Sequence, residues 1–533
     1  MEGKRPLSLL AAAPLASALL VSATLLGGCG ASGSAPSRRE IIDSRDQYDP
    51  RSLDPALSTD VPTGRAVGYV FDGLTRFEAD ASVQPALAER WDVSPDGSQY
   101  TFHLRRGVKF HDGTPFTAHN VVSSWKRALN PATKSGAAQF LFPIKGAREF
   151  NAGKSPALEG VVARDDSTLI VTLTEPLAIF TKMLAMPVAA VVPEQIPPNF
   201  GEHPIGTGPW KLVEWKHDDY LLFSRNEAYY SGPPKTDTLR ARIIAEPSTG
   251  VAEFESGNVD ILQIPETEAR DWQEDESRSP LLMSVPALQL IYIGINTTRG
   301  PLTDARVRQA INYAVDVNQI IERLISGRGT HAAGVIPPAL PGYDSTRKGY
   351  PYDPAKAKQL LAAAGHPNGI DIELWTSTRP IFLRIAETIQ AYLAQVGIRA
   401  KIVQRESAAA RGAARKGETD MILKDWYADY PDAEGFLFPL LSSTSKGAGG
   451  NVSFYSNPKF DSLVVAARRE IDESKRNALY KQADSVAFVD APMLFLYFYN
   501  DLYAVQPWLK GFRPPVIFNG QRWTTVSIDS VRK

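Results

Sequence analysis

The chain has 533 residues, 43% hydrophobic and 22% charged, a balance typical of globular proteins and not of disordered chains, collagens or coiled coils. Lys and Arg (58) nearly equal Asp and Glu (59), so the net charge of −1 gives no basic excess and no nucleic-acid partner is expected. The single cysteine excludes a disulfide framework and Cys-cluster metal sites.

The first segment has the pattern of a secretory signal. Two basic residues precede a weakly apolar stretch over 7–26, and small residues follow it, a pattern typical of a signal peptide. The sequence LGGC at 26–29 resembles a bacterial lipobox, which implies that residues 1–28 are removed and that Cys29 carries the lipid. An ordinary signal peptide or a single membrane anchor is the alternative interpretation.

Residues 29–40 are small and polar and contain proline, which indicates a flexible tether between the lipid and a folded body. A Pro-Asp-Gly turn at 95–97 then leads into alternating apolar and polar residues at 100–104, the signal of a β-hairpin. Thr117 is expected to cap a helix, and residues 167–173 predict a further strand.

The second half alternates helices and strands. The predicted elements are a helix from near Thr303, a helix over 353–364, a strand over 370–374, a helix over 381–396, a strand over 398–404 and a buried strand over 491–499. Strand, helix and strand with short connections predict a right-handed parallel βαβ unit. The chain is therefore expected to be a mixed α/β protein with at least two lobes.

Signatures of catalysis are missing from the sequence. None of the seven histidines lies within four residues of another, and HExxH, GxSxG and phosphate-loop motifs are absent. The one suggestive pair, His111-Asp112, lies in a turn signature, Phe110–Thr114. We therefore expect no enzyme activity, no metal and no cofactor.

Several segments match a known family in order. They are LAERW at 87–91, SPDG at 94–97, FHLRRGVKFHDGTPFT at 102–117, PIGTGPWKLVEW at 204–215, GNVDIL at 257–262, GIN at 294–296, RVRQAINYAVD at 306–316 and WYADYPDAEGFL at 426–437. Together they resemble family 5 of the extracellular solute-binding proteins, the lipid-anchored or periplasmic receptors that feed peptide ABC importers. The resemblance runs from about residue 48 to 510, and residues 144–176 look most like the oligopeptide-binding branch.

The resemblance implies an α/β fold of the periplasmic-binding-protein type, a type II clamshell of two lobes with an additional subdomain inserted in the first lobe. Lobe I would combine residues 41–75, 200–287 and 505–533, the insert would span 76–199 and lobe II would span 288–504. The hinge would then be two chain crossings near residues 287 and 505. Such lobes close over a ligand and remove it from water.

The resemblance also implies a binding site. In peptide-binding relatives, the residue matching Asp429 pairs with the ligand's α-ammonium, and leaving such a buried charge unpaired costs about 3–5 kcal/mol. Trp426 and Tyr427 would line the cleft, and the backbone of Val61, in the loop that contains Asp60, would bond to an extended peptide. The alternatives are an acidic surface loop for Asp429 and a core position for Trp426.

Some positions depart from the family pattern. Leu423 stands where some oligopeptide binders have an Arg that meets the ligand's carboxylate, and Ser123 and Ser407 stand in place of a Tyr and a Trp. These departures leave the preferred peptide length open. Lys424 could serve the carboxylate, but a solvated lysine is the favoured interpretation.

We therefore expect an extracytoplasmic, monomeric receptor that is anchored to the cell membrane through Cys29, captures oligopeptides and delivers them to a membrane ABC permease. The main alternative keeps the fold but binds a dipeptide, nickel, haem or a sugar; Asp429 favours an aminated ligand over a sugar. A secreted hydrolase and a surface sensor or adhesin are further alternatives.

Overall fold

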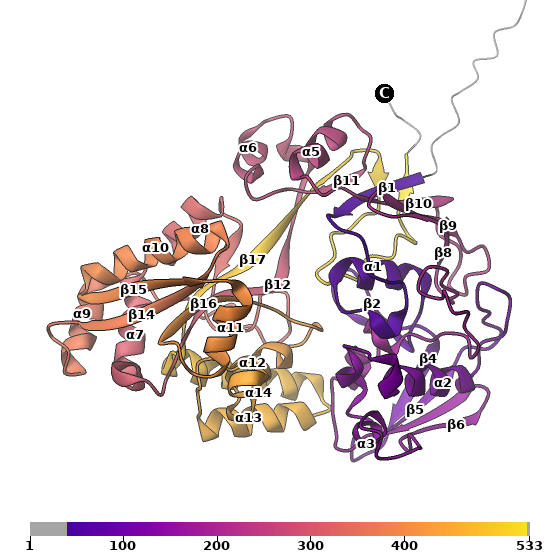
Figure 1. Ribbon diagram of the computed structural model, residues 1–533, viewed down its shortest axis with the longest axis horizontal. Helices are drawn as coiled ribbons and strands as arrows, with labels where there is room; N and C mark the ends of the chain where they lie inside the picture. The colour runs from indigo at the N-terminus through magenta and orange to yellow at the C-terminus, as the bar shows by residue number, and fades with distance from the viewer. Residues whose placement is uncertain (1–39, 530–533) are drawn as a thin grey trace, which may run out of the picture. The chain divides into compact units, whose positions relative to one another are not determined.

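An 11-stranded mixed sheet runs through residues 40–529, the part of the chain that the computed structural model describes (Figure 1). In spatial order its strands are β15 (Ile398–Arg405), β14 (Ile370–Ser377), β16 (Met421–Tyr427), β12 (Leu282–Ile295), β17 (Met493–Val505), β11 (Ile261–Gln263), β1 (Glu40–Asp46), β10 (Thr238–Ile243), β9 (Tyr220–Arg225) and β8 (Trp210–Lys216), and β13 (Gly329–His331) also pairs with β17. The predicted signal peptide, Cys29 and all but the last residue of the predicted tether lie outside the described residues.

The strands β12 and β17 form an antiparallel ribbon that joins the two halves of this sheet. At one end of the ribbon β17 also pairs with β11, and at the other end β12 pairs with β16. The ladder is interrupted after Pro286, which pairs with Asn500; the next pair is Leu290 with Phe498. Between these two pairs β12 therefore advances by four residues and β17 by only two. The bulge leaves residues 287–289 outside the β12–β17 ladder.

The predicted βαβ unit is confirmed. The strands β14 and β15 pair in parallel through eight residue pairs, and α10 (Pro380–Gln395) connects them. Apolar positions at helical spacing, Ile385, Ile389 and Leu393, are fully buried because they form one face of α10 over the sheet. On the other face α11 (Ser407–Arg415) packs beside Trp375. The helices α7 (Ala305–Ala314), α8 (Val317–Leu324) and α9 (Pro354–Ala363) belong to the same half.

A separate four-stranded antiparallel sheet has the order β4 (Ala88–Val93), β5 (Gln99–Leu104), β7 (Thr168–Thr172) and β6 (Val161–Asp165). This sheet contains the predicted hairpin, β4–β5. As predicted, Thr117 caps the helix α2 (Ala118–Leu129), in a reciprocal capping box with Asn120. The side chains of Val121, Trp125 and Leu129 are fully buried.

One hydrophobic core is shared by this small sheet and three helices from the C-terminal half: α12 (Glu434–Leu441), α13 (Pro458–Arg469) and α14 (Glu473–Asp490). The other elements are α1 (Val61–Val70), α3 (Ala147–Asn151), α4 (Phe180–Met183), α5 (Pro247–Glu255), α6 (Ala269–Glu274), the pair β2 (Thr75–Phe77) and β3 (Val83–Pro85), and the pair β18 (Leu509–Lys510) and β19 (Ser527–Ile528). Over residues 40–529, no helix has both the length and the apolar character needed to cross a bilayer.

Candidate functional site

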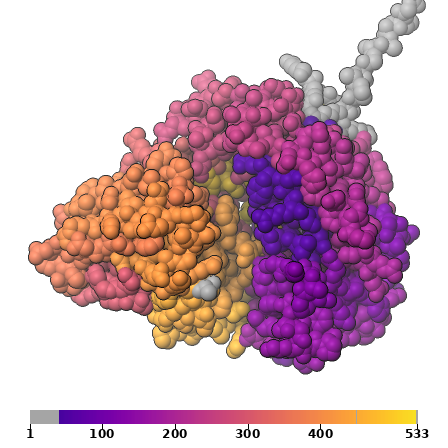
Figure 2. All heavy atoms as spheres, in the orientation of Figure 1, coloured from indigo at the N-terminus to yellow at the C-terminus, as the bar shows by residue number. Residues whose placement is uncertain are grey.

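A cavity of about 400 Å³ lies beside the interrupted part of the β12–β17 ribbon. Figure 2 shows a hollow at this place, between the indigo residues near the N-terminus and the orange and yellow residues of the second half. The volume is within the usual range for small-molecule sites. The lining comes from residues 58–61 and 65, 136–140, 186–188, 263, 287–288, 427–429, 501 and 503, and 515–518.

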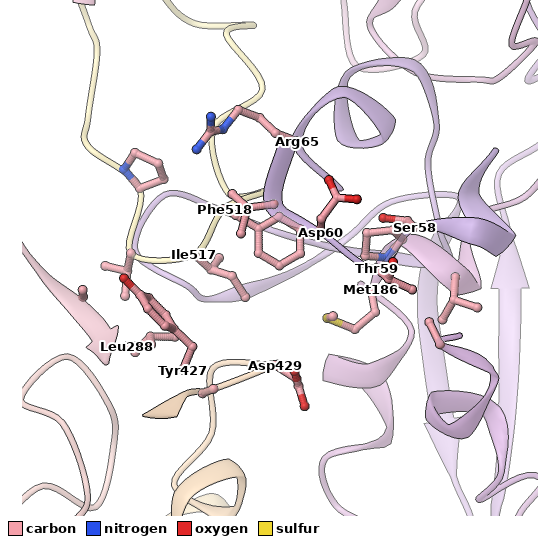
Figure 3. A pocket seen from close by; sticks show the side chains of 18 of the residues that line it. Ser58, Thr59, Asp60, Arg65, Met186, Leu288, Tyr427, Asp429, Ile517 and Phe518 are labelled. Atoms are coloured by element: carbon pink, nitrogen blue, oxygen red, sulfur yellow. The ribbon is translucent and has the colours of Figure 1, made fainter. Parts of the chain in front are cut away.

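Asp429, which follows the end of β16, lines this cavity (Figure 3). Its carboxylate has no hydrogen bond or ion pair with any other residue in the described range 40–529. The side chain is reached by solvent, but the surrounding cavity wall desolvates it and raises the pKa of Asp429 above its ordinary value. A carboxylate without a partner in a cavity is suited to a cationic ligand group.

The loop that carries Asp429 is fixed from two sides. Lys182 on α4 donates to the carbonyl oxygen of Pro431 at 2.9 Å and to Oδ2 of Asp432 at 2.6 Å. The other oxygen of Asp432 accepts from the backbone N–H of Glu434 at 2.9 Å. The Glu434 carboxylate is buried and ion-paired with Arg468 at 3.0 Å. These contacts hold the loop in place, so Asp429 is presented by a rigid support.

The two aromatic residues before Asp429 have different surroundings. Tyr427 lines the cavity and is 56% exposed. Trp426 is not among the lining residues, which corrects the prediction that it lines the cleft. Its indole N–H donates to the carbonyl oxygen of Gly435 at 2.8 Å, and its ring packs against the shared core. The physical reason is the alternation of a strand, which sends neighbouring side chains to opposite faces.

Asp60 and Val61 both line the cavity at the start of α1. The Asp60 carboxylate caps this helix, because its Oδ1 accepts from the backbone N–H of Thr63 at 3.0 Å. The Val61 side chain is 45% exposed. The structure therefore brings Asp60, Val61, Tyr427 and Asp429 to one cavity, and backbone bonding of a ligand to Val61 stays a prediction.

The cavity also contains polar residues that the sequence patterns do not predict, among them Arg65, Gln263 and Asp501. Arg65 is ion-paired with the buried Asp46, and Gln263 donates to Oδ1 of Asp501 at 2.9 Å. No motif joins these residues, because the fold brings them together from distant segments. A usable signal was the polar pair Asn500-Asp501 inside the otherwise apolar β17.

The positions that depart from the family pattern do not line the cavity. Leu423, on β16, points into the buried core, so it could not meet a ligand. Lys424 is half-buried rather than solvated, which corrects that expectation; burial and the neighbouring charge of Arg415 lower its pKa to about 8. Ser123 lies on α2 and bonds to its own helix, and Ser407 begins α11.

No group of three or more His, Cys, Asp or Glu side chains in residues 40–529 is placed to hold a metal ion.

The sequence model described as "Bacterial extracellular solute-binding proteins, family 5 Middle" matches residues 82–448. The chain belongs to family 5. Family 5 proteins are solute-binding components of ABC importers, and the predicted fold class, a two-lobed type II periplasmic binding protein with mixed α/β content, is confirmed.

Similar family 5 proteins include receptors for different ligands. Heme-binding protein A of Haemophilus influenzae is 32% identical over 528 residues, which cover 92% of this chain and 95% of that protein. The dipeptide-binding protein of Escherichia coli K12 is 34% identical over 490 residues, with coverage of 87% and 90%. The unliganded open form of the periplasmic murein tripeptide-binding protein MppA has a TM-score of 0.81 and 27% identity, with coverage of 92% and 97%.

Proposed function

We propose that this family 5 protein is a membrane-anchored receptor that captures oligopeptides and delivers them to an ABC permease. The observation that carries the proposal is the unpartnered carboxylate of Asp429 in a cavity of about 400 Å³. A peptide's α-ammonium would supply the missing cation. Because every unblocked peptide has this group, recognition there would be independent of side chains.

The surroundings of Asp429 support a charged contact of useful strength. Desolvation raises the pKa of this carboxyl, which means that its ionised form is less stable in the ligand-free protein than in water. An incoming ammonium would form a charge-assisted hydrogen bond and offset that difference. The rigid loop around Pro431 and Asp432 lowers the entropy lost when the contact forms.

The capture step would use the division into lobes that the family resemblance implies. Lobe I would be 41–75, 200–287 and 505–533, the inserted subdomain 76–199 and lobe II 288–504. The chain would then cross between lobes in the ribbon formed by β12 and β17. Bending of this ribbon would bring Val61 and Asp429 around the ligand.

The anchoring proposal rests on the sequence at 26–29. Residues 1–28 would be removed and Cys29 would carry the lipid that holds a monomeric receptor to the membrane. The intact mass of the mature protein tests this: acylation of an N-terminal Cys29 should appear in the wild type and be absent from Cys29→Ser. An unprocessed N-terminus in the wild type would contradict it.

The ligand assignment is tested by affinity selection on the full chain, purified without refolding. The protein is offered an equimolar library of peptides of two to five residues, the same library with acetylated N-termini, haem and glutathione, and retained molecules are identified by mass. We expect retention of free peptides, with acetylation reducing retention at least about 10-fold. Retention of haem or glutathione without peptides would overturn the peptide assignment.

The matched variants are Asp429→Asn and Asp371→Asn. The second removes an exposed carboxylate of β14 that is ion-paired with Arg399. Both variants change the net charge by the same amount, so only a local role of Asp429 would separate them. Equal retention by the two variants would remove Asp429 from the proposed site.

A further inference from the structure

The charged lining of the cavity is strongly unbalanced. Apart from tyrosines, its ionisable side chains are three aspartates and one arginine: Asp60, Asp429, Asp501 and Arg65. Arg65 is 6% exposed and already ion-paired with Asp46, which is buried behind it. None of the three aspartates of the lining is in an ion pair with another residue of the described chain. The cavity therefore has an excess of negative charge that one α-ammonium would not neutralise.

Asp501 is a second carboxylate of the cavity, and the proposed function assigns it no ligand group. It lies on β17, where one oxygen accepts from Gln263 at 2.9 Å. The neighbouring guanidinium of Arg328 is directed elsewhere: it donates to the carbonyl oxygens of Ile264 at 3.2 Å and Asn500 at 3.4 Å. Burial raises the pKa of Asp501, as expected for a carboxylate with incomplete compensation.

An exposed aromatic ring lines the same cavity as this carboxylate. Tyr427 is 56% exposed, and it flanks β12 on one side while Asp501 flanks β12 on the other, so both side chains face the space beside the interrupted ribbon. Tyr427 is also two residues before Asp429, and both residues line the cavity (Figure 3). Asp429 and Asp501 can thus be reached by one short ligand.

A carboxylate beside an exposed aromatic face is a combination suited to the side chains of lysine and arginine. The carboxylate accepts charge-assisted hydrogen bonds, and the ring attracts a cation over its face and packs against the apolar stem. We propose that Asp501 and Tyr427 form a subsite for a basic side chain, so that the preferred ligands are short peptides containing Lys or Arg. This inference rests on the proposed function, since Asp429 is taken to hold the α-ammonium.

The same charge excess disfavours anionic ligands. A molecule with a net negative charge, such as glutathione at neutral pH, would place its carboxylates against an acidic wall in which Arg65, the one cationic side chain that residues 40–529 contribute, is already paired. Like charges in contact at an interface are strongly unfavourable. The cavity of this chain is therefore better suited to cationic peptides than to anionic molecules.

The test compares tripeptides that differ by one charge. Lys-Ala-Ala, Ala-Lys-Ala and Ala-Ala-Lys are each titrated calorimetrically against the full chain beside counterparts in which norleucine replaces lysine. Norleucine keeps the apolar stem and removes the ammonium. We expect at least one lysine peptide to bind about 10-fold or more tightly than its counterpart.

The variants are Asp501→Asn and the exposed control Asp371→Asn. Asp501→Asn should reduce the lysine preference to within about twofold, and Asp371→Asn should keep it. Equal binding of lysine and norleucine peptides by the wild type, or a preference that survives Asp501→Asn, would overturn the subsite while the peptide receptor stands. Failure of all six peptides to bind, together with no retention of any peptide from the library of two to five residues, would overturn the proposed function itself.

Discussion

The ammonium nitrogen of Lys182 lies 2.6 Å from Oδ2 of Asp432 and 2.9 Å from the carbonyl oxygen of Pro431. Lys182 belongs to α4, and Asp432 lies 250 residues later in the loop that contains Asp429. The position of the candidate ammonium-binding carboxylate therefore depends on a side chain from a distant part of the sequence.

Lys182→Met should destabilise the protein and weaken ligand binding together. The Asp432 side chain is 4% exposed, so removing its cation leaves a buried charge unpaired, at a cost of about 3–5 kcal/mol in unfolding free energy. Urea denaturation measures this loss. The double variant Lys182→Met/Asp432→Asn should be more stable than Lys182→Met alone because it removes both charges; a less stable double variant would contradict the explanation.

Asp429→Asn should leave the ligand-free protein at least as stable as the wild type, although it weakens peptide binding. The pKa of Asp429 is raised by folding, so its ionised form at neutral pH opposes folding, and a neutral amide removes that opposition. Thermal unfolding of both proteins without ligand checks the sign. A loss of more than about 1 kcal/mol would instead show that Asp429 has a structural partner.

Peptide affinity should fall as the pH is lowered through the raised pKa of Asp429. Only the ionised carboxylate attracts an ammonium, and because its pKa is above the ordinary 3.8, the loss should begin at a higher pH than for an exposed aspartate. Calorimetric titration of an all-alanine tripeptide at several pH values between 7.5 and 4.5 gives the affinity as a function of pH. The profile of Asp429→Asn should be flatter; identical profiles would assign the titration to another group.

Substitutions of the two neighbouring aromatic residues should affect different properties, one the stability of the fold and the other the affinity for peptides. Trp426→Phe removes the hydrogen bond to Gly435 and should lower the unfolding free energy by about 1 kcal/mol, with little change in peptide affinity. Tyr427→Ala removes an exposed ring of the cavity and should lower peptide affinity several-fold, with little change in stability. Denaturation and calorimetry on both variants test the pair, and the reverse assignment of effects would contradict the geometry described.

The elements that sequence patterns predicted correctly are specified by neighbours in the chain. The α10 helix has its buried face at Ile385, Ile389 and Leu393, and α2 begins at the Thr117 cap. Periodicity and capping are local properties, so they are visible without the fold.

The polar half of the site depends on long-range packing. Gln263 and Asp501 meet because β11 and β17, far apart in the sequence, pair in one sheet. Arg65 on α1 joins them through its ion pair with Asp46 on β1 of the same sheet. Trp426 was misassigned for a related reason. Its type suited a binding cleft, but the orientation of β16 decided which of two successive aromatic side chains faces the cavity.

The bulge in the β12–β17 ribbon has a consequence for divergence within family 5. Here β12 has two more residues than β17, and two is an even number. Because side chains alternate between faces with a period of two, Pro286 and Leu290 still point to the same face of the sheet. Ala287 and Leu288, which lie inside the bulge, form cavity wall. Insertion or deletion of another pair of residues here would enlarge or shrink the binding space and leave the inward and outward pattern of both flanking strands unchanged.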